Sequence, residues 1–211
     1  MAAGIRLVLA STSPARLRTL RAAGLRPDVI ASGVDETGVT AGGVAELVAE
    51  LARRKAEAVS DRIRRVSRRV VIVGCDSMLE LDGRSYGKPE TATAAIDRWR
   101  RMSGRSGVLH TGHHVIVRGL GQTVAREAVA ATTVHFAELS SGEIETYVAT
   151  GEPLQVAGAF TVDGLGGAYV RRIEGDYHNV VGISLPLLRT LLGDLGIEWP
   201  SLWPSGALKG S

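Results

Sequence analysis

Two adjacent stretches, "VVIVGC" at 70–75 and "LELDGRSY" at 79–86, constrain the fold of this chain more than any others. An uninterrupted apolar run is typical of a strand that is covered on both faces. Asp-Gly between extended flanks is the strongest short-range signal of a two-residue β-hairpin. The same segment therefore predicts a buried strand and an antiparallel neighbour, which together indicate a mixed sheet.

Helical and extended patterns alternate around this segment. The first residues predict a strand at 5–11 and then a helix at 14–24, with Ser13 as its N-cap and Pro14 at its first position. Residues 44–59 predict an amphipathic helix. Further helices are expected at 91–104, at 140–151, where Ser140 and Glu143 form a capping box, and at 184–196. Long strands are expected at 108–119 and 123–136, and short glycine-rich strands after residue 151. The predicted class is α/β or α+β, built on a mixed sheet.

The length of 211 residues suits one large or two-lobed domain, which we expect to cover residues 1–198. Residues 199–211 are rich in Pro, Gly and Ser and predict a flexible tail. Apolar runs fall well short of the roughly 20 residues of a membrane helix, and the N-terminal apolar stretch is too short for a secretory signal. A single cysteine, Cys75, cannot form an internal disulfide, so a cytoplasmic location without membrane partners is expected.

The net charge of +3 sets no strong constraint on partners. The densest basic segment, "DRIRRVSRR" at 61–69, lacks interleaved aromatic residues. A solvated helix end or loop is therefore the favoured interpretation, and a nucleic-acid patch is the alternative.

Arg16 is unusual because it is the third residue of a predicted helix, where a cation opposes the macrodipole at a cost of about 0.3–1 kcal/mol when exposed. The hydroxyl groups of Ser11, Thr12 and Ser13 and the free N–H groups of the helix start lie beside it. This combination predicts an anion pocket, and a bound phosphate would turn the penalty into an attraction. The expectation is that Arg16 sits badly in the empty protein; the alternative is a surface arginine in a poor position.

Lys55 lies about 40° from both Leu51 and Val59 on a helical wheel, in the middle of the apolar stripe. Arg53 and Arg54 fall on the outer face. A lysine in such a place either extends along the apolar surface to water or points towards an anion.

Asp76 follows the apolar run directly, and the carboxyl end of a buried strand is where open α/β sheets place ligand-handling groups. If Asp82-Gly83 forms a two-residue turn, Ser77 faces Lys88, so Lys88 lies within reach of Asp76 and keeps it ionised. The alternatives are a turn aspartate and an exposed ion pair. Arg16, Lys55 and Lys88 could together hold a polyphosphate while Asp76 activates water. Glu36, in a polar loop, is a second carboxylate for a metal ion such as Mg²⁺.

Other motifs carry less weight. "HTGHH" at 110–114 lies in a predicted strand, where His110 and His113 face opposite ways, so a zinc site is not favoured. The glycine-rich run at 164–170 lacks the Lys-Ser/Thr of a P-loop. Cys75 lies within an apolar run and is expected in the core rather than as a nucleophile.

Seven ordered motifs between about residues 7 and 192 resemble those of Maf-family nucleoside triphosphate pyrophosphatases: "LASTSPARLRTL", "VDE", "LARRKAEAV", "GCDS", "GKP", "TGEPLQVAGAFTVDGLGG" and "GDYHNVVGISLPLL". The resemblance implies an ITPase-like fold, with a long curved mixed sheet, flanking helices and a cleft between two lobes. It implies hydrolysis between the α- and β-phosphates of a nucleoside triphosphate, dependence on a divalent cation (Mg²⁺, Mn²⁺ or Co²⁺), a cytoplasmic location and a homodimer. It also links the chain to the clearing of modified nucleotides and to arrest of cell division.

The resemblance also implies roles for individual residues. Asp76 resembles the proton acceptor that activates water, and Glu36 the metal-associated glutamate, with Asp76 as the second metal ligand. The resemblance assigns phosphate binding to hydroxyl and cationic side chains: Ser11, Ser13, Arg16, Lys55 and Lys88. The catalytic residues that the resemblance implies are therefore Asp76, Glu36, Lys55 and Lys88.

The positions that distinguish bases in the family are Ala15, Ser77 and Asp163. The branch acting on dTTP and UTP has Arg, Thr and Gln there, and the branch acting on 7-methyl-GTP has Trp, Gln and Glu. This chain matches neither set, and Val156 replaces a lysine of many members. The base preference therefore stays open. The alternative functions are a non-catalytic regulator of cell division or a nucleic-acid-binding protein, and a phosphatase that releases orthophosphate.

Overall fold

One mixed sheet organises the protein. The computed structural model describes residues 4–64, 68–119 and 121–204. Within these residues the strands are β1 (Arg6–Leu9), β2 (Asp28–Val29), β3 (Val70–Leu81), β4 (Arg84–Tyr86), β5 (Ser106–Gly119), β6 (Gln122–Phe136) and β7 (Val170–Glu174). Their order is β2-β1-β3-β5-β6-β7, with β4 also paired to β3. Because β1 is parallel to β2 and β3 while the other pairs are antiparallel, the predicted mixed sheet is confirmed.

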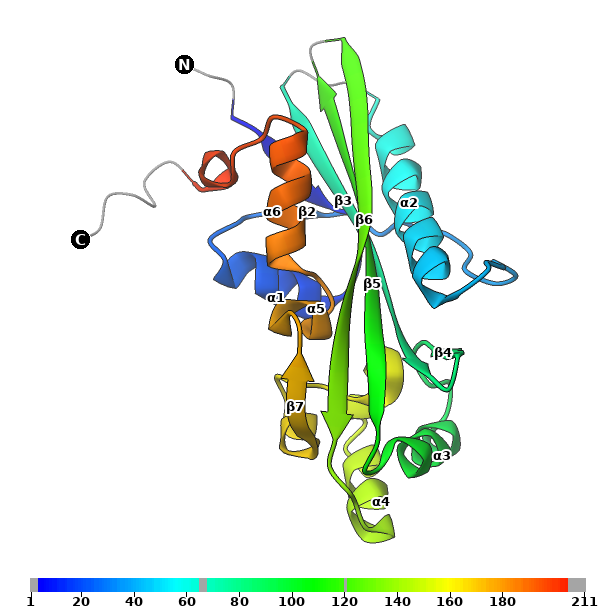
Figure 1. Ribbon diagram of the computed structural model, residues 1–211. Coiled ribbons are helices and arrows are strands. Elements are labelled where there is room, and N and C mark those ends of the chain that lie inside the picture. Colours follow the sequence, from blue (N-terminus) through cyan, green and yellow to red (C-terminus); the bar gives the residue numbers. More distant parts are fainter. Residues whose placement is uncertain (1–3, 65–67, 120, 205–211) are drawn as a thin grey trace, which may run out of the picture.

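Helices cover both faces of the sheet (Figure 1). They are α1 (Pro14–Ala22), α2 (Val44–Arg62), α3 (Ala92–Met102), α4 (Ser141–Ala149), α5 (Tyr177–Val181) and α6 (Leu185–Asp194). Short 3₁₀ segments are η1 (Glu152–Gln155), η2 (Ala157–Ala159), η3 (Leu165–Tyr169) and η4 (Trp199–Leu202). Ser13 caps α1 and Ser140 caps α4, the latter in a capping box with Glu143, as predicted from these residue types.

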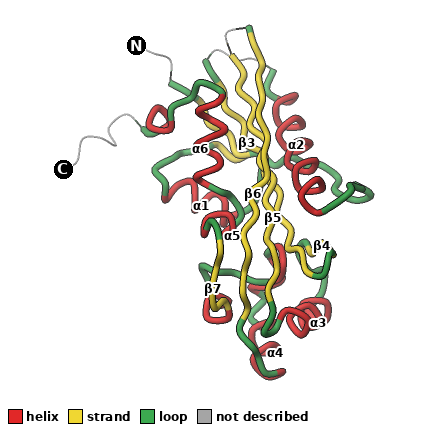
Figure 2. Tube along the Cα trace, in the orientation of Figure 1, coloured by secondary structure: helices red, strands yellow, loops and turns green. Residues whose placement is uncertain are grey.

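Three apolar clusters form the core. One lies between the sheet and α1 and α6, a second between the sheet and α2, and a third joins the far end of the sheet to α3 and α4. The long strands β5 and β6 run along the length of the sheet past these regions (Figure 2). The helices therefore gather at the two ends of a single extended sheet.

Helix α2 approaches the sheet unusually closely at two glycines. A Cβ atom on Gly74 would lie 2.3 Å from the carbonyl oxygen of Ala52, and one on Gly112 would lie 2.1 Å from that of Val48. Real Cβ atoms do not come so near a backbone oxygen, so only glycine permits this packing. The close approach brings the buried side of α2, including Lys55, directly onto β3.

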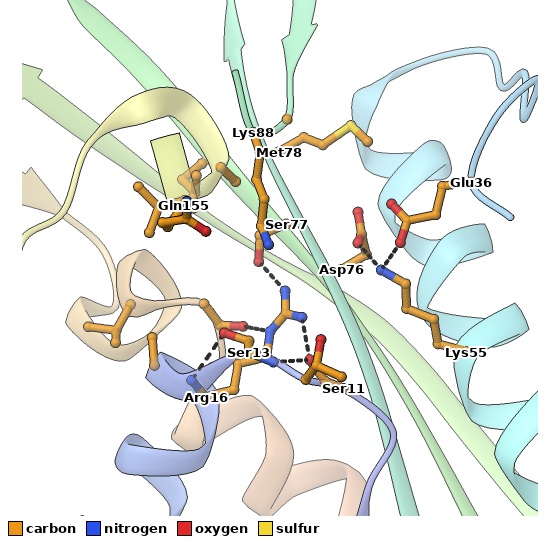
Figure 3. A pocket seen from close by; sticks show the side chains of 18 of the residues that line it. Ser11, Ser13, Arg16, Glu36, Lys55, Asp76, Ser77, Met78, Lys88 and Gln155 are labelled. Atoms are coloured by element: carbon orange, nitrogen blue, oxygen red, sulfur yellow. Dashed lines mark hydrogen bonds and ion pairs between the residues drawn. The ribbon is translucent and has the colours of Figure 1, made fainter. Parts of the chain in front are cut away.

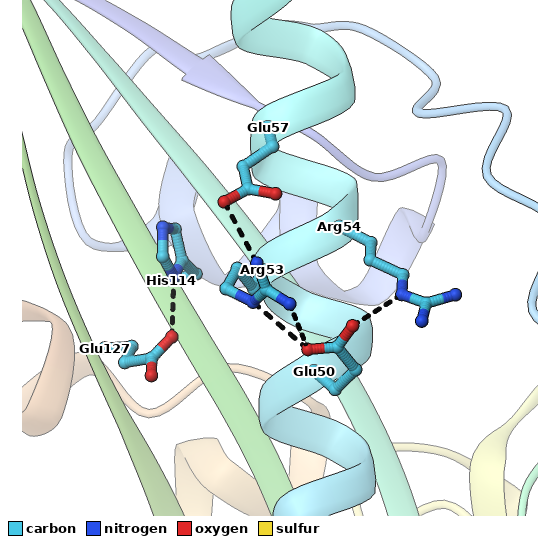
Figure 4. Close-up of polar contacts among 6 residues, drawn as sticks. All are labelled: Glu50, Arg53, Arg54, Glu57, His114 and Glu127. Atoms are coloured by element: carbon cyan, nitrogen blue, oxygen red, sulfur yellow. Dashed lines mark hydrogen bonds and ion pairs between the residues drawn. The ribbon is translucent and has the colours of Figure 1, made fainter. Parts of the chain in front are cut away.

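The outer face of α2 is an acid–base ladder (Figure 4). Glu50 pairs with Arg53 at 2.5 Å and with Arg54 at 2.6 Å, and Arg53 also reaches Glu57 at 3.4 Å. The outward orientation predicted for both arginines is thus confirmed. Because carboxylates neutralise them, these arginines contribute little free positive charge to the surface.

One expectation about irregular regions is wrong, and another concerns a segment that the described residues cover only in part. Short glycine-rich strands were expected after residue 151, but η1, η2 and η3 precede β7, the one strand in the described chain beyond that point. The predicted flexible tail begins with η4, where Leu202 is buried in the core and the Trp203 indole N–H donates to the carbonyl of Ala23 at 3.2 Å. Large apolar side chains outweigh the effect of Pro and Ser there; residues 205–211 lie outside the described residues. No described helix has the length and apolarity required to span a bilayer.

We expect Gly74→Ala to lower the free energy of unfolding by about 1–3 kcal/mol, because the new methyl group must push α2 away from β3. Urea denaturation measures this change. Gly142→Ala is the matched control, because a methyl group at this helical glycine would have no other atom within 4 Å, and it should stay within about 1 kcal/mol of the wild type. Equal stabilities for the two variants would contradict the close packing of α2.

Candidate active site

A cavity of about 720 Å³ opens where β3 changes its neighbour on one edge. Residues 70–73 of β3 pair with β1 and residues 79–81 pair with β4, whereas 74–78 have no strand on that side in the described chain. Asp76, Ser77 and Met78 all line the cavity. Because successive strand residues point to opposite faces, Asp76 turns towards α2 and Ser77 towards α1.

Asp76 and Glu36 converge on one cation, the ammonium group of Lys55 (Figure 3). Lys55 Nζ lies 2.5 Å from Asp76 Oδ1 and 2.8 Å from Glu36 Oε1. Lys55 and Asp76 are only 8% and 7% exposed. Lys55 therefore points towards anions. Of the two interpretations of a lysine on the apolar stripe, this is the one that the structure confirms.

The position expected for Asp76 within its strand is wrong. It lies in the middle of β3 rather than at the carboxyl end, because β3 continues to Leu81 through its pairing with β5. Burial raises the pKa of the Asp76 carboxyl above its ordinary value, while the charges of Lys55 and Arg16 act in the opposite direction. The Asp76 carboxylate is thus more basic than an exposed aspartate, and the neighbouring Lys55 ammonium favours its ionised form.

Arg16 is not poorly placed, contrary to expectation. The side chain is 8% exposed and its guanidinium donates to the carbonyl of Gly182 at 2.8 Å, to Ser11 Oγ at 3.1 Å and to Ser77 Oγ at 2.9 Å. Ser13 accepts the backbone N–H of Arg16, and its own N–H donates to Ser11 Oγ at 3.2 Å. No carboxylate lies within ion-pair distance of Arg16 in the described chain. The cation is held in place while its charge is left uncompensated.

The predicted pairing of Ser77 with Lys88 is wrong, although the hairpin itself is confirmed. Leu81 faces Arg84 and Leu79 faces Tyr86, but the ladder ends there. Lys88 nevertheless lines the same cavity, and its side chain extends into it in Figure 3. Lys55, and not Lys88, is the cation beside Asp76. The described residues supply no ion-pair partner for the exposed Lys88.

The cavity is lined by all three positions that the resemblance links to nucleobase preference: Ala15, Ser77 and Asp163. Ser77 Oγ is already engaged, since it accepts from Arg16 and shares a 2.9 Å hydrogen bond with Thr111 Oγ1. Asp163 lies 3.5 Å from Arg18, a partner that sequence reasoning missed. Helical spacing could have identified Arg18 as a residue beside the cavity, because it lies one turn after Ala15 on the same side of α1.

Two further residues that support the site were missed. Gly182 has a φ of 118°, which favours glycine, and its carbonyl anchors Arg16. His113 accepts the N–H of Ser184 at 2.9 Å and donates through Nδ1 to the carbonyl of Thr111. Burial lowers the pKa of His113 to about 4, so the ring is neutral near pH 7 and supports the start of α6. Neither contact has a local sequence signal.

Cys75 lies in the core, as expected. Burial raises the pKa of its thiol to about 11, so the group stays protonated near pH 7. A protonated thiol is a poor nucleophile.

Comparison with known proteins gives a consistent result. The family model described as "Maf-like protein" matches residues 6–195. A protein of Salinispora tropica named nucleoside triphosphate pyrophosphatase is 58% identical over 96% of this chain and 89% of its own length. One of Cutibacterium acnes with the same name is 54% identical over 93% of each chain. The Ham1 protein of Staphylococcus aureus overlaps 63% of this chain and 72% of its own with a TM-score of 0.39 and 18% identity, too weak an overlap to support a conclusion.

The matched residues include every described strand and all the residues that line the cavity. The relatives share about half of their residues with this chain and align along almost all of it. The chain therefore belongs to the Maf family.

Proposed function

We propose that the protein hydrolyses nucleoside triphosphates between the α- and β-phosphates, releasing a nucleoside monophosphate and pyrophosphate. The observation that carries the proposal is Arg16, a buried cation without a carboxylate partner in the described chain, on the wall of a cavity large enough for a nucleotide. The names of the curated relatives support the same reaction.

Arg16 and Lys88 are suited to hold the phosphates. A guanidinium carries five N–H groups, and three contacts to the protein leave donors free for phosphate oxygens. Pro14 lacks an N–H and Ser13 accepts that of Arg16, so the Ala15 N–H is the donor left at the start of α1. It and the hydroxyl groups of Ser11 and Ser13 lie around the same part of the cavity. These donors would stabilise the negative charge that develops on the leaving pyrophosphate.

Asp76 is suited to accept the proton of the attacking water. As the water oxygen bonds to the α-phosphorus, its proton passes to an Asp76 oxygen, and the bond from this phosphorus to the bridging oxygen breaks. The bridging oxygen leaves with the bonding electrons as part of pyrophosphate. The raised pKa of Asp76 favours this transfer, and Lys55 holds the carboxylate in place.

The carboxylates of Glu36 and Asp76 would hold a divalent cation. Both already converge on a positive group, and hard carboxylate oxygens suit Mg²⁺ or Mn²⁺, with Co²⁺ as a further candidate. No group of three or more potential protein ligands gathers in the described residues, which fits an ion that takes its other ligands from phosphate and water. When bound there, the cation supplies positive charge that neutralises phosphate oxygens.

We also propose a cytoplasmic homodimer, on the basis of the family resemblance. The alternative of a nucleic-acid-binding regulator is less favoured, because Arg62 of the basic segment donates to the carbonyls of Ala31 and Ser32. Residues 65–67 of that segment lie outside the described residues.

Product analysis tests the reaction. Canonical and modified triphosphates are incubated with Mg²⁺, Mn²⁺ or Co²⁺, and pyrophosphate is measured separately from orthophosphate. We expect pyrophosphate, with a base preference that shows what Ala15, Ser77 and Asp163 select. Release of orthophosphate alone would establish the phosphatase alternative, and no turnover by folded protein would favour the regulator.

We expect Asp76→Asn to lower kcat by about 100-fold or more, because the amide cannot accept the proton. Calorimetry with an α,β-methylene triphosphate analogue should show binding within a few-fold of the wild type. Asp61→Asn, at an exposed position on α2, is the control and should leave kcat unchanged. A fully active Asp76→Asn protein would exclude Asp76 as the base.

Arg16→Met should weaken analogue binding and also lower the free energy of unfolding by about 1–3 kcal/mol, since Ser11, Ser77 and Gly182 each lose a hydrogen-bond partner. Calorimetry and urea denaturation measure the two effects. Arg21→Met, at an exposed position on the same helix, should change neither quantity. Unchanged analogue affinity in Arg16→Met would remove Arg16 from the phosphate site.

A further inference from the structure

We propose that Arg98, on α3, is a positioning residue that holds Lys88 in the cavity through the carbonyl group of Gly87. The inference rests on the proposed role of Lys88 in binding phosphate. Lys88 needs such support because β4 ends at Tyr86, so no strand pairing fixes the backbone that follows. Arg98 itself is not among the residues that line the cavity, so it would act only through its neighbours.

The Gly87 carbonyl is held from two sides. Arg98 Nη1 donates to it at 2.5 Å, and the backbone N–H of Gly158 donates to the same oxygen at 3.1 Å. On the other side of Lys88, the buried Pro89 restricts the backbone of the preceding residue to extended conformations. Lys88 thus lies between a carbonyl with two donors and a residue that limits its own dihedral angles.

Burying the Arg98 guanidinium costs free energy, and this cost is unexplained if the residue has no role beyond packing. Its guanidinium lies 4.9 Å from the centre of the Tyr86 ring, and its Nε is buried without a hydrogen-bond partner in the described chain. No carboxylate of the described chain lies within ion-pair distance of it. An apolar residue could cover Tyr86 without this desolvation, whereas only a donor can hold the Gly87 carbonyl.

The same carbonyl connects two walls of the cavity. Gly158 has a φ of 75°, and a Cβ there would lie 2.9 Å from Leu79 Cβ, so its N–H is held in a fixed position. Val156 and Ala157, just before it, line the cavity, as do Gly87 and Lys88. Arg98 therefore stabilises the junction between the lysine loop and the segment at 156–158.

A double-mutant cycle tests the proposal, using calorimetry with the α,β-methylene triphosphate analogue. Arg98→Met keeps a long apolar side chain beside Tyr86 but removes the guanidinium donor, and we expect it to weaken binding about tenfold. In a Lys88→Met background the same substitution should cause no further loss. Arg98→Lys keeps the charge and should recover part of the affinity. Arg100→Met, at an exposed position on the same helix, is the matched control and should bind as the wild type does.

Three results would overturn the proposal: an unchanged affinity in Arg98→Met, an equal loss in both backgrounds, or a loss in Arg98→Met when Lys88→Met alone binds normally. If Arg98→Met fails to fold, Arg98→Lys replaces it in the cycle, with a smaller loss expected only when Lys88 is present. Thermal unfolding of each variant separates lost binding from lost structure. Failure of the proposed reaction is distinct, because it would appear as missing pyrophosphate from the wild-type protein.

Discussion

The buried ammonium of Lys55 between two carboxylates is the interaction on which the rest of the site depends. Removing Lys55 or Asp76 would leave its partner's charge in a place almost closed to water, so these two groups must be positioned together, with the half-exposed Glu36 beside them. The three groups come from three different elements within residues 36–76: a loop, a helix and a strand. Only a helix lying nearly against the sheet can bring Lys55 to Asp76, and Gly74 and Gly112 make that approach possible.

The cavity itself arises from a change of partner along β3. β3 is parallel to β1 over residues 70–73 and antiparallel to β4 over 79–81, which leaves residues 74–78 without a strand on that edge in the described chain. Side chains from both faces of the sheet meet at such a gap. The acid–base group on the α2 side and the phosphate-binding group on the α1 side can therefore act on one ligand, although the sheet separates their helices.

Local patterns predicted what depends on neighbouring residues. The Asp82-Gly83 turn, with φ values of 53° and 70°, set the hairpin register, and helical periodicity correctly turned Lys55 inward. The end of that ladder was not predictable from the same rule, because Pro89 and the contacts of Gly87 decide where pairing stops. The burial of Arg16 was missed for a related reason. Two of its partners, Ser77 and Gly182, lie 61 and 166 residues away, and no periodicity connects them.

The placement of the tryptophans has a consequence for spectroscopy. Trp99 is buried in the cluster under α3 and α4, in edge-to-face contact with Phe136 and Tyr147. Trp203 packs at the opposite end, against the C-terminal end of α1, and Trp199 packs against the same apolar cluster. Each end of the sheet thus carries its own intrinsic fluorophore, and proteins that retain a single indole would report the melting of one end at a time. Emission spectra can in this way show whether the two halves of the fold unfold as one cooperative unit.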